Sequence, residues 1–93
     1  MSEINIPQGS VEYIYADLRT DRVLDTQAIS MSISSTSAPS YWVNAEWVGE
    51  PAKFRSARLL LDGTLPKGLY YVFARIIDVP ESPIIPVGKL RIT

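Results

Sequence analysis

Strict alternation of side-chain type in the segment 29–34 is the feature that most constrains the fold. Ile29, Met31 and Ile33 occupy every second position, and serines occupy the positions between them. Successive side chains of a strand point to opposite faces, so this pattern predicts a strand with one dry face and one wet face. A helix would need an apolar residue every three or four positions, and that period does not recur along the chain. The sequence therefore predicts an all-β protein.

Five further segments have the residue types of strands, and turn-forming Gly, Pro, Asp and Ser residues separate them. The predicted strands are 11–18, 29–34, 41–48, 54–61, 69–79 and 87–93. The segment 17–27 predicts a loop or a short edge strand. Roughly seven short strands at this spacing predict an immunoglobulin-like antiparallel β-sandwich. We expect one domain, 1–93, in which residues 1–9 form an N-terminal arm.

The segment 65–72 resembles the start of strand F in immunoglobulin-like domains. In that motif a glycine two residues before a tyrosine allows a tight corner, and the tyrosine hydroxyl bonds back to the main chain. Gly68 and Tyr70 have this spacing. We predict that Tyr70 is the corner tyrosine, that Val72 points inward, and that Trp42 or Trp47 is the core tryptophan of the facing strand.

The residue inventory excludes most catalytic chemistry. The chain has no histidine and no cysteine, which removes His-dependent nucleophiles and the usual zinc and copper sites. Its five glycines stand singly, so no phosphate-binding loop is present. Asp17, Asp21 and Asp25 could gather calcium or form an acid/base pair, but Arg19 and Arg22 lie between them, and a solvated, salt-bridged edge is expected instead. We predict a non-enzymatic protein without a metal or cofactor.

Charge and hydropathy limit the classes of partner. The formal net charge is −1, so the chain lacks the positive field that attracts nucleic acid. No segment approaches the roughly 18 consecutive apolar residues of a membrane helix, and the N-terminus lacks the basic start and apolar run of a signal peptide. We expect a soluble protein that binds neither nucleic acid nor membrane.

The predicted strand 69–79 has apolar residues on both faces. If Val72 and its alternate neighbours point inward, then Tyr71, Phe73, Arg75 and Ile77 form an outward row that is unusually apolar for a solvent face. Aromatic residues with an arginine are favoured at interface hot spots. Alternatively, a loop or the N-terminal arm covers this row, or the register is reversed.

The connection after this strand is a second candidate contact. Pro80 and Pro83 stiffen it, and Ile84 and Ile85 add an apolar stretch beside an expected edge strand. The alternative is a hairpin connection that only turns the chain. The predicted partner-binding residues are Tyr71, Phe73, Arg75, Ile77, Asp78, Pro80, Glu81, Ile84 and Ile85.

Short motifs spread along the chain carry a family resemblance. They are Leu24-Asp25-Thr26-Gln27, Trp42, Ala45-Glu46-Trp47, Gly49, Ala-Arg-Leu-Leu at 57–60, the corner segment 65–70, Asp-x-Pro-Glu-x-Pro at 78–83, and Pro86-Val87-Gly88. With these motifs the chain resembles, over about 11–93, small immunoglobulin-like virion structural proteins of tailed bacteriophages of actinobacteria. Ile84-Ile85 departs from the family pattern, and this departure puts in doubt whether the contact loop is the same as in the family.

The resemblance implies a structural protein of the virion that is synthesised in the cytoplasm of the host bacterium. It implies other virion proteins as partners, above all the major capsid protein, contacted by multiple symmetric copies whose multivalency strengthens each weak contact. A capsid decoration (cement) or minor head protein is the leading expectation, and a neck (head–tail connector) or tail component is the alternative. A free carbohydrate-binding or adhesion module is a further alternative, with Trp42, Trp47 and the tyrosines stacking on sugars.

Overall fold

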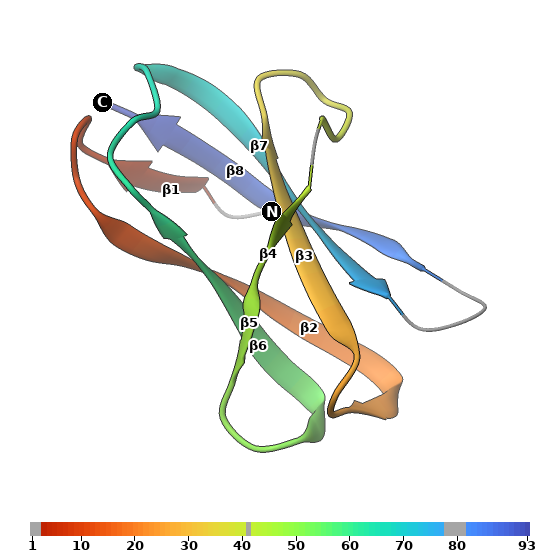
Figure 1. The fold of residues 1–93 in the computed structure, drawn as a ribbon. Helices are drawn as coiled ribbons and strands as arrows, with labels where there is room; N and C mark the ends of the chain where they lie inside the picture. The colour runs from red at the N-terminus through yellow and green to blue at the C-terminus, as the bar shows by residue number, and fades with distance from the viewer. Residues whose placement is uncertain (1–2, 41, 78–81) are drawn as a thin grey trace.

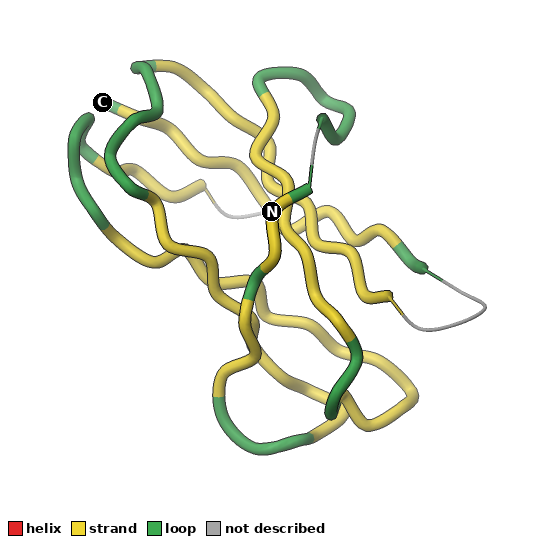
Figure 2. Tube along the Cα trace, in the orientation of Figure 1, coloured by secondary structure: helices red, strands yellow, loops and turns green. Residues whose placement is uncertain are grey.

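The computed structural model describes residues 3–40, 42–77 and 82–93 and contains eight strands. They are β1 (Glu3–Ile6), β2 (Glu12–Leu24), β3 (Ala28–Ser34), β4 (Val43–Asn44), β5 (Glu46–Val48), β6 (Ala52–Leu61), β7 (Gly68–Ile77) and β8 (Ile84–Ile92). Figure 2 shows these strands joined by loops and turns. Within the described ranges there is no helix that could cross a membrane.

The strands form two sheets that pack face to face (Figure 1). One sheet has the order β1-β8-β7-β3-β4, and the other has the order β2-β6-β5. Paired strands are antiparallel except β1 and β8, which run parallel. The predicted all-β sandwich is confirmed. In the larger sheet β7 lies between β3 and β8, and in the smaller sheet β6 lies between β2 and β5. This strand order agrees with an immunoglobulin-like sandwich, but that finer assignment stays a prediction.

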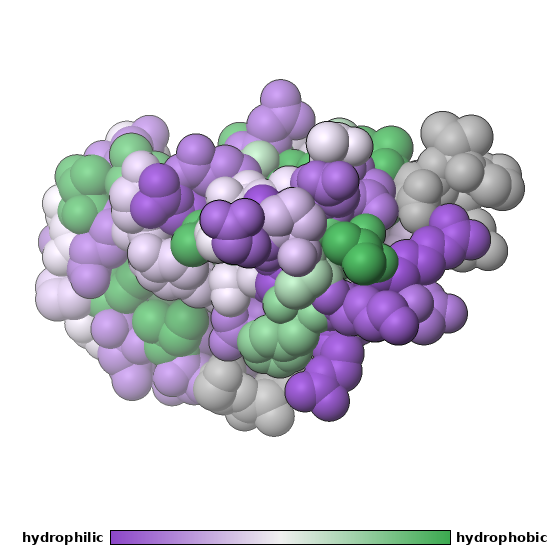
Figure 3. Space-filling view, turned by 90° about the horizontal axis from the view of Figure 1, so that it is seen from below, coloured by the Kyte–Doolittle hydropathy of each residue, from purple (hydrophilic) through white to green (hydrophobic). Residues whose placement is uncertain are grey.

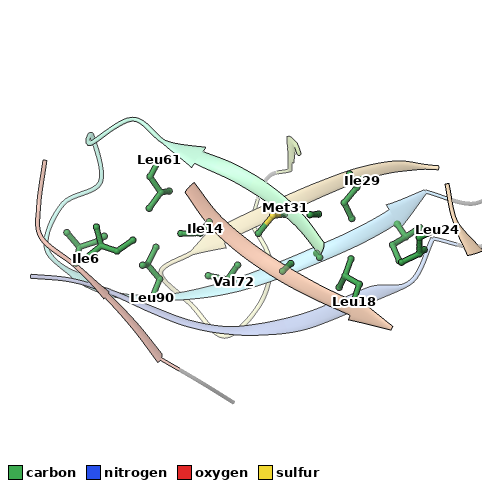
Figure 4. Close-up of a cluster of buried hydrophobic side chains, with 14 residues drawn as sticks. Ile6, Ile14, Leu18, Leu24, Ile29, Met31, Leu61, Val72 and Leu90 are labelled. Atoms are coloured by element: carbon green, nitrogen blue, oxygen red, sulfur yellow. The ribbon is translucent and has the colours of Figure 1, made fainter. Parts of the chain in front are cut away.

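The hydrophobic core fills the space between the two sheets (Figure 4). Alternate residues of β2 and of β7 point into it, as the period-two pattern predicts. Leu24 and Ile29 lie at one end of the core, and Ile6 lies at the other. The buried side chains are Ile6, Ile14, Ala16, Leu18, Leu24, Ile29, Met31, Ala57, Leu61, Val72, Ala74, Ile76, Leu90 and Ile92.

The predicted corner at the start of β7 is present. The hydroxyl of Tyr70 donates a hydrogen bond to the carbonyl oxygen of Pro66 at 2.8 Å, and Val72 is buried. Trp47 packs against the core and donates its indole Nε1–H to the carbonyl oxygen of Gln27 at 2.7 Å. Trp47 is thus the tryptophan that contacts the core, although it is only half-buried, whereas Trp42 lies beside Arg75.

The predicted strand 41–48 is divided between the two sheets. β4 pairs with β3, whereas β5 pairs with β6 in the opposite sheet. Ala45 stands between them, and its amide donates to the carbonyl oxygen of Ile29 at 2.9 Å. The prediction of a single strand here was wrong because the chain changes sheets at Ala45, and residue composition carries no signal for such a crossing.

The expected edges agree only in part with the structure, since residues 17–24 do lie in an edge strand but a longer one than expected. Most of the segment 17–27, expected as a loop or short edge strand, continues β2, with a register irregularity between Arg19 and Leu24. The expected edge strand at the end of the chain, β8, lies between β7 and β1. β1 belongs to the segment expected as an N-terminal arm, and it pairs with residues 89–92 of β8, so it covers that part of the edge. Pro86 fits within β8 because it pairs with Phe73 at a register irregularity of the β7–β8 ladder.

The serine face of β3 is buried rather than wet. Ser30, Ser32 and Ser34 are as inaccessible to solvent as the core residues Ile29 and Met31 of the same strand. The connection from β3 to β4 folds over this face, since the amide of Ser40 donates to Ser32 Oγ at 3.1 Å. The expectation of a solvated face was wrong because hydroxyl groups can be buried when the main chain supplies their hydrogen bonds.

One end of the sandwich is fastened by Arg55 of β6. Its guanidinium donates to the carbonyl oxygens of Leu24, Asp25 and Gly49 at 2.8, 3.0 and 2.8 Å. It also lies over the ring of Trp47, 5.2 Å from the centroid. Arg55 thus joins the end of β2 and the β2–β3 turn to the β5–β6 turn through main-chain carbonyl groups.

Candidate functional site

Exposed aromatic and arginine side chains gather on the outer face of the sheet β2-β6-β5. On β2 and β6 the residues that alternate with core residues point away from the core, and several of them are large. Tyr13, Tyr15, Phe54 and Leu60 are between 41% and 54% exposed. The tyrosine–arginine face is defined here as Tyr13, Tyr15, Arg19, Phe54, Arg58 and Leu60.

The β2–β6 register sets these residues in cross-strand pairs. Tyr13 lies opposite Leu60, Tyr15 opposite Arg58, and Arg19 opposite Phe54. The guanidinium carbon of Arg58 is 4.1 Å from the ring centroid of Tyr13, and that of Arg19 is 5.3 Å from the centroid of Phe54. Such cation–π contacts hold the rings and guanidinium groups in place while leaving them accessible.

Two acidic side chains of the same sheet form hydrogen bonds with side chains of β6 and hold them in place. Arg58 Nε donates to Glu46 Oε1 of the neighbouring β5, and this hydrogen bond raises the pKa of Arg58 above its ordinary value. Ser56 Oγ donates to Asp17 Oδ1 at 2.6 Å. The face therefore presents positive and negative groups in fixed positions between its aromatic rings.

A shallow groove of about 310 Å³ borders the face. One part of the groove is lined by residues of the face, namely Tyr13, Arg58 and Leu60. Another part is lined by the segment where the chain changes sheets, Asn44 to Glu46. An open depression of this kind can receive a protruding side chain of a partner. On the side of the molecule drawn in Figure 3, apolar residues form separate patches among polar ones.

The carboxylates considered for calcium do not form a site in the described ranges. Groups of three or more Asp or Glu residues close enough to hold a metal ion are not found there. Asp17 is engaged with Ser56 on the outer face. The main-chain amide of Asp25 bonds to Gln27 Oε1 at 2.7 Å within the β2–β3 turn.

The predicted contact row on β7 is largely covered. Phe73 is 8% exposed, so its prediction as an exposed contact was wrong. Arg75 lies over the Trp42 ring, 4.6 Å from the centroid, and its Nε is buried without a hydrogen-bond partner among the described residues. Tyr71 is half-buried beside Lys89. The β3–β4 connection lies over Ser32, the β3 residue opposite Phe73, and this agrees with the alternative of a covering loop.

Of the remaining predicted contacts, Ile84 lies opposite Arg75 in the β7–β8 ladder, on the same face as Ile77. Ile77 and Ile84 are exposed. Ile85 is partly buried and packs against the core, so only part of its side chain is available for a contact. Asp78, Pro80 and Glu81 lie outside the described residues.

The tyrosine–arginine face was not predicted from the sequence. The string Tyr13-Ile14-Tyr15-Ala16 has apolar or aromatic residues at both parities, so alternation alone does not tell which set is exposed. The signal that could have identified it is the pairing of tyrosines on one strand with Arg58 and Leu60 on another, which requires the β2–β6 register.

Comparisons with protein-family models, curated proteins and solved structures found no match to this chain. The resemblance to phage virion proteins therefore stays a prediction.

Proposed function

We propose that the protein is a non-enzymatic binding module that attaches to a partner protein through the tyrosine–arginine face. The observation that carries this proposal is the exposure of Tyr13, Tyr15, Phe54 and Leu60 on one sheet face, with Arg19 and Arg58 stacked on the rings. Tyrosine and arginine are enriched among residues that dominate binding energy in protein interfaces. Rings already held by cation–π contacts lose little side-chain entropy on binding.

The geometry favours a protein over a carbohydrate as the partner. A sugar-binding platform stacks rings against the faces of successive sugars, and Tyr13 and Tyr15 are instead inclined by 49° with centroids 6.4 Å apart. Neither tryptophan supplies a free platform, since both are half-buried against arginine side chains. The charges of Asp17 and Glu46 suit a partner with its own arranged charges.

We propose further that the partner belongs to a tailed-phage particle, and that the protein is a capsid decoration or minor head protein on the major capsid protein. The motif resemblance supports this location. A small module with one moderate contact face also suits a lattice, because many symmetric copies make a weak single contact sufficient. A neck or tail component is the alternative position.

The experiment is quantitative mass spectrometry of purified particles of the phage that encodes the chain, with the major capsid protein as internal reference. We expect a molar ratio near one or a simple fraction of one, as a lattice position requires. A few copies per particle would move the protein to the neck or tail. Absence from washed particles would overturn the virion proposal and leave the protein-binding face to be tested with other partners.

A further inference from the structure

β2 forms a long open edge. It has 13 residues and lies at the end of the order β2-β6-β5 (Figure 1). The other strands at sheet ends are β1, β4 and β5, which have four, two and three residues. An unpaired strand edge presents main-chain donors and acceptors that can pair with another chain.

The part of β2 that pairs regularly with β6 lacks the usual protection of an edge. Residues 12–19 pair with β6 without interruption, and the register irregularity begins only after Arg19. This part contains no proline, glycine or lysine. Natural edges are normally guarded by prolines, charged side chains, bulges or short length. Among the described strands at sheet ends, β2 is the long one, and residues 12–19 have only the charges of Glu12, Asp17 and Arg19 as protection.

We propose that β2 pairs antiparallel with β2 of a second copy, about a two-fold axis at Ala16. The residue numbers of two opposite residues, one from each copy, then add up to 32. On the outer face, Tyr13 lies opposite Arg19 of the second copy, and Tyr15 lies opposite Asp17 of the second copy. On the inner face, Ile14 lies opposite Leu18 of the second copy, and Ala16 lies opposite its own counterpart.

Side-chain complementarity selects this register. The tyrosine–arginine pair can stack, and the tyrosine hydroxyl can donate to the carboxylate of Asp17, while the inner pairs are apolar. An axis at Asp17 would set two aspartates opposite each other. An axis at Tyr15 would oppose Glu12 to Leu18, and an axis at Leu18 would require pairing through the irregular part of β2.

The pairing would join two sandwiches through one continuous sheet with the order β5-β6-β2-β2-β6-β5. Both tyrosine–arginine faces would then lie side by side on the same surface. A dimer could thus meet two neighbouring subunits of a symmetric partner, which strengthens attachment without any new contact. The dimer itself does not depend on the identity of that partner.

The test uses sedimentation of the unmodified chain and disulfide trapping with single-cysteine variants. The natural chain has no cysteine, so Tyr15→Cys and Asp17→Cys each carry one thiol. Opposite residues of an antiparallel pair lie within disulfide reach, whereas residues displaced by two positions lie at about 7–8 Å, beyond it. Circular dichroism of both reduced variants checks that the β-fold is kept.

We expect a concentration-dependent species of twice the 10.4 kDa chain mass. On mild oxidation, an equimolar mixture of Tyr15→Cys and Asp17→Cys should give several-fold more mixed disulfide than either variant gives alone. A monomer at all concentrations without preferential trapping would overturn the proposal. So would a dimer in which the mixed disulfide is not preferred, because it would use another surface or register.

Discussion

Arg58 lies over the ring of Tyr13, with its guanidinium carbon 4.1 Å from the ring centroid. The two residues come from neighbouring strands, β6 and β2, and the guanidinium also donates to Glu46 of β5. All three strands of the smaller sheet thus contribute to one exposed arrangement of ring and charges. The opposite sheet has comparable residues, Arg75 and Trp42, but there Arg75 Nε is buried.

The corner hydrogen bond of Tyr70 contributes to stability rather than to binding. Tyr70→Phe removes the donor to Pro66 and should lower the free energy of unfolding by about 1 kcal/mol. Tyr71→Phe is the matched control, because no hydrogen bond of its hydroxyl is found among the described residues, and it should change stability by less than about 0.5 kcal/mol. Urea unfolding measures both, and equal effects would contradict a role for the corner.

Arg55 stabilises one end of the sandwich through three short hydrogen bonds to main-chain carbonyl groups. Arg55→Lys keeps the charge but loses the planar donor geometry, so we expect a loss of about 2 kcal/mol. Arg19→Lys changes an exposed arginine that stacks only on Phe54 among the described residues, and should cost less than about 0.5 kcal/mol. Thermal or urea unfolding compares the two, and a neutral Arg55→Lys would show that water satisfies these carbonyls equally well.

Gly63 is constrained by its conformation and by a close neighbour. Its φ is +84°, and a Cβ there would lie 2.7 Å from the carbonyl oxygen of Gly9. Gly49 has a similar φ of +78° with open space around it, so Gly49→Ala should cost about 1 kcal/mol from backbone strain alone. Gly63→Ala should cost at least about 1 kcal/mol more, from the added clash. Equal losses of unfolding free energy would mean that the turn at Gly9 moves away freely.

Asp62 makes a small part of the folding stability sensitive to acid. Its Oδ1 accepts from the hydroxyl of Thr64 at 2.6 Å and from the Thr64 amide at 3.1 Å, and these bonds lower the pKa of Asp62. A lowered pKa in the folded state favours folding above the unfolded-state pKa, and this contribution is lost as the pH falls through the folded-state pKa.

The hydroxyl of Thr64 can be removed selectively. Thr64→Val keeps the main-chain amide, so we expect the pKa of Asp62 to rise toward its ordinary value without reaching it. NMR titration of the Asp62 side-chain carboxyl carbon between pH 2 and 6 measures the shift, a window that spans the ordinary pKa of about 3.9. An unchanged pKa would contradict the hydroxyl as the main cause.

Local patterns predicted much of the sandwich correctly. Alternation around Met31 and Val72 identified strands that contribute to the core, and the spacing of Gly68 and Tyr70 predicted the corner hydrogen bond. Each of these features depends on residues close in the sequence. The crossing between sheets at Ala45 depends instead on the amide bond to Ile29, which only the tertiary fold supplies.

The candidate site was harder to predict because alternation identifies two faces and does not tell which is covered. For β7 the outward residue Phe73 is buried, with the β3–β4 connection folded over the adjoining strand. For β2 the outward residues Tyr13 and Tyr15 stay exposed, and their partners lie more than 40 positions away on β6. Contacts between residues far apart in the sequence therefore decide which face is available.

Attachment of two matched variants to phage particles that lack the protein tests the central claim most directly. Leu60 on the tyrosine–arginine face and Ile84 on the opposite sheet are 49% and 50% exposed, so aspartate should perturb folding similarly at both positions. With the β-type circular dichroism spectrum retained, Leu60→Asp should weaken attachment at least about tenfold, equivalent to about 1.4 kcal/mol, and Ile84→Asp should attach normally. Normal attachment of Leu60→Asp, or loss with Ile84→Asp alone, would contradict the tyrosine–arginine face as the binding surface.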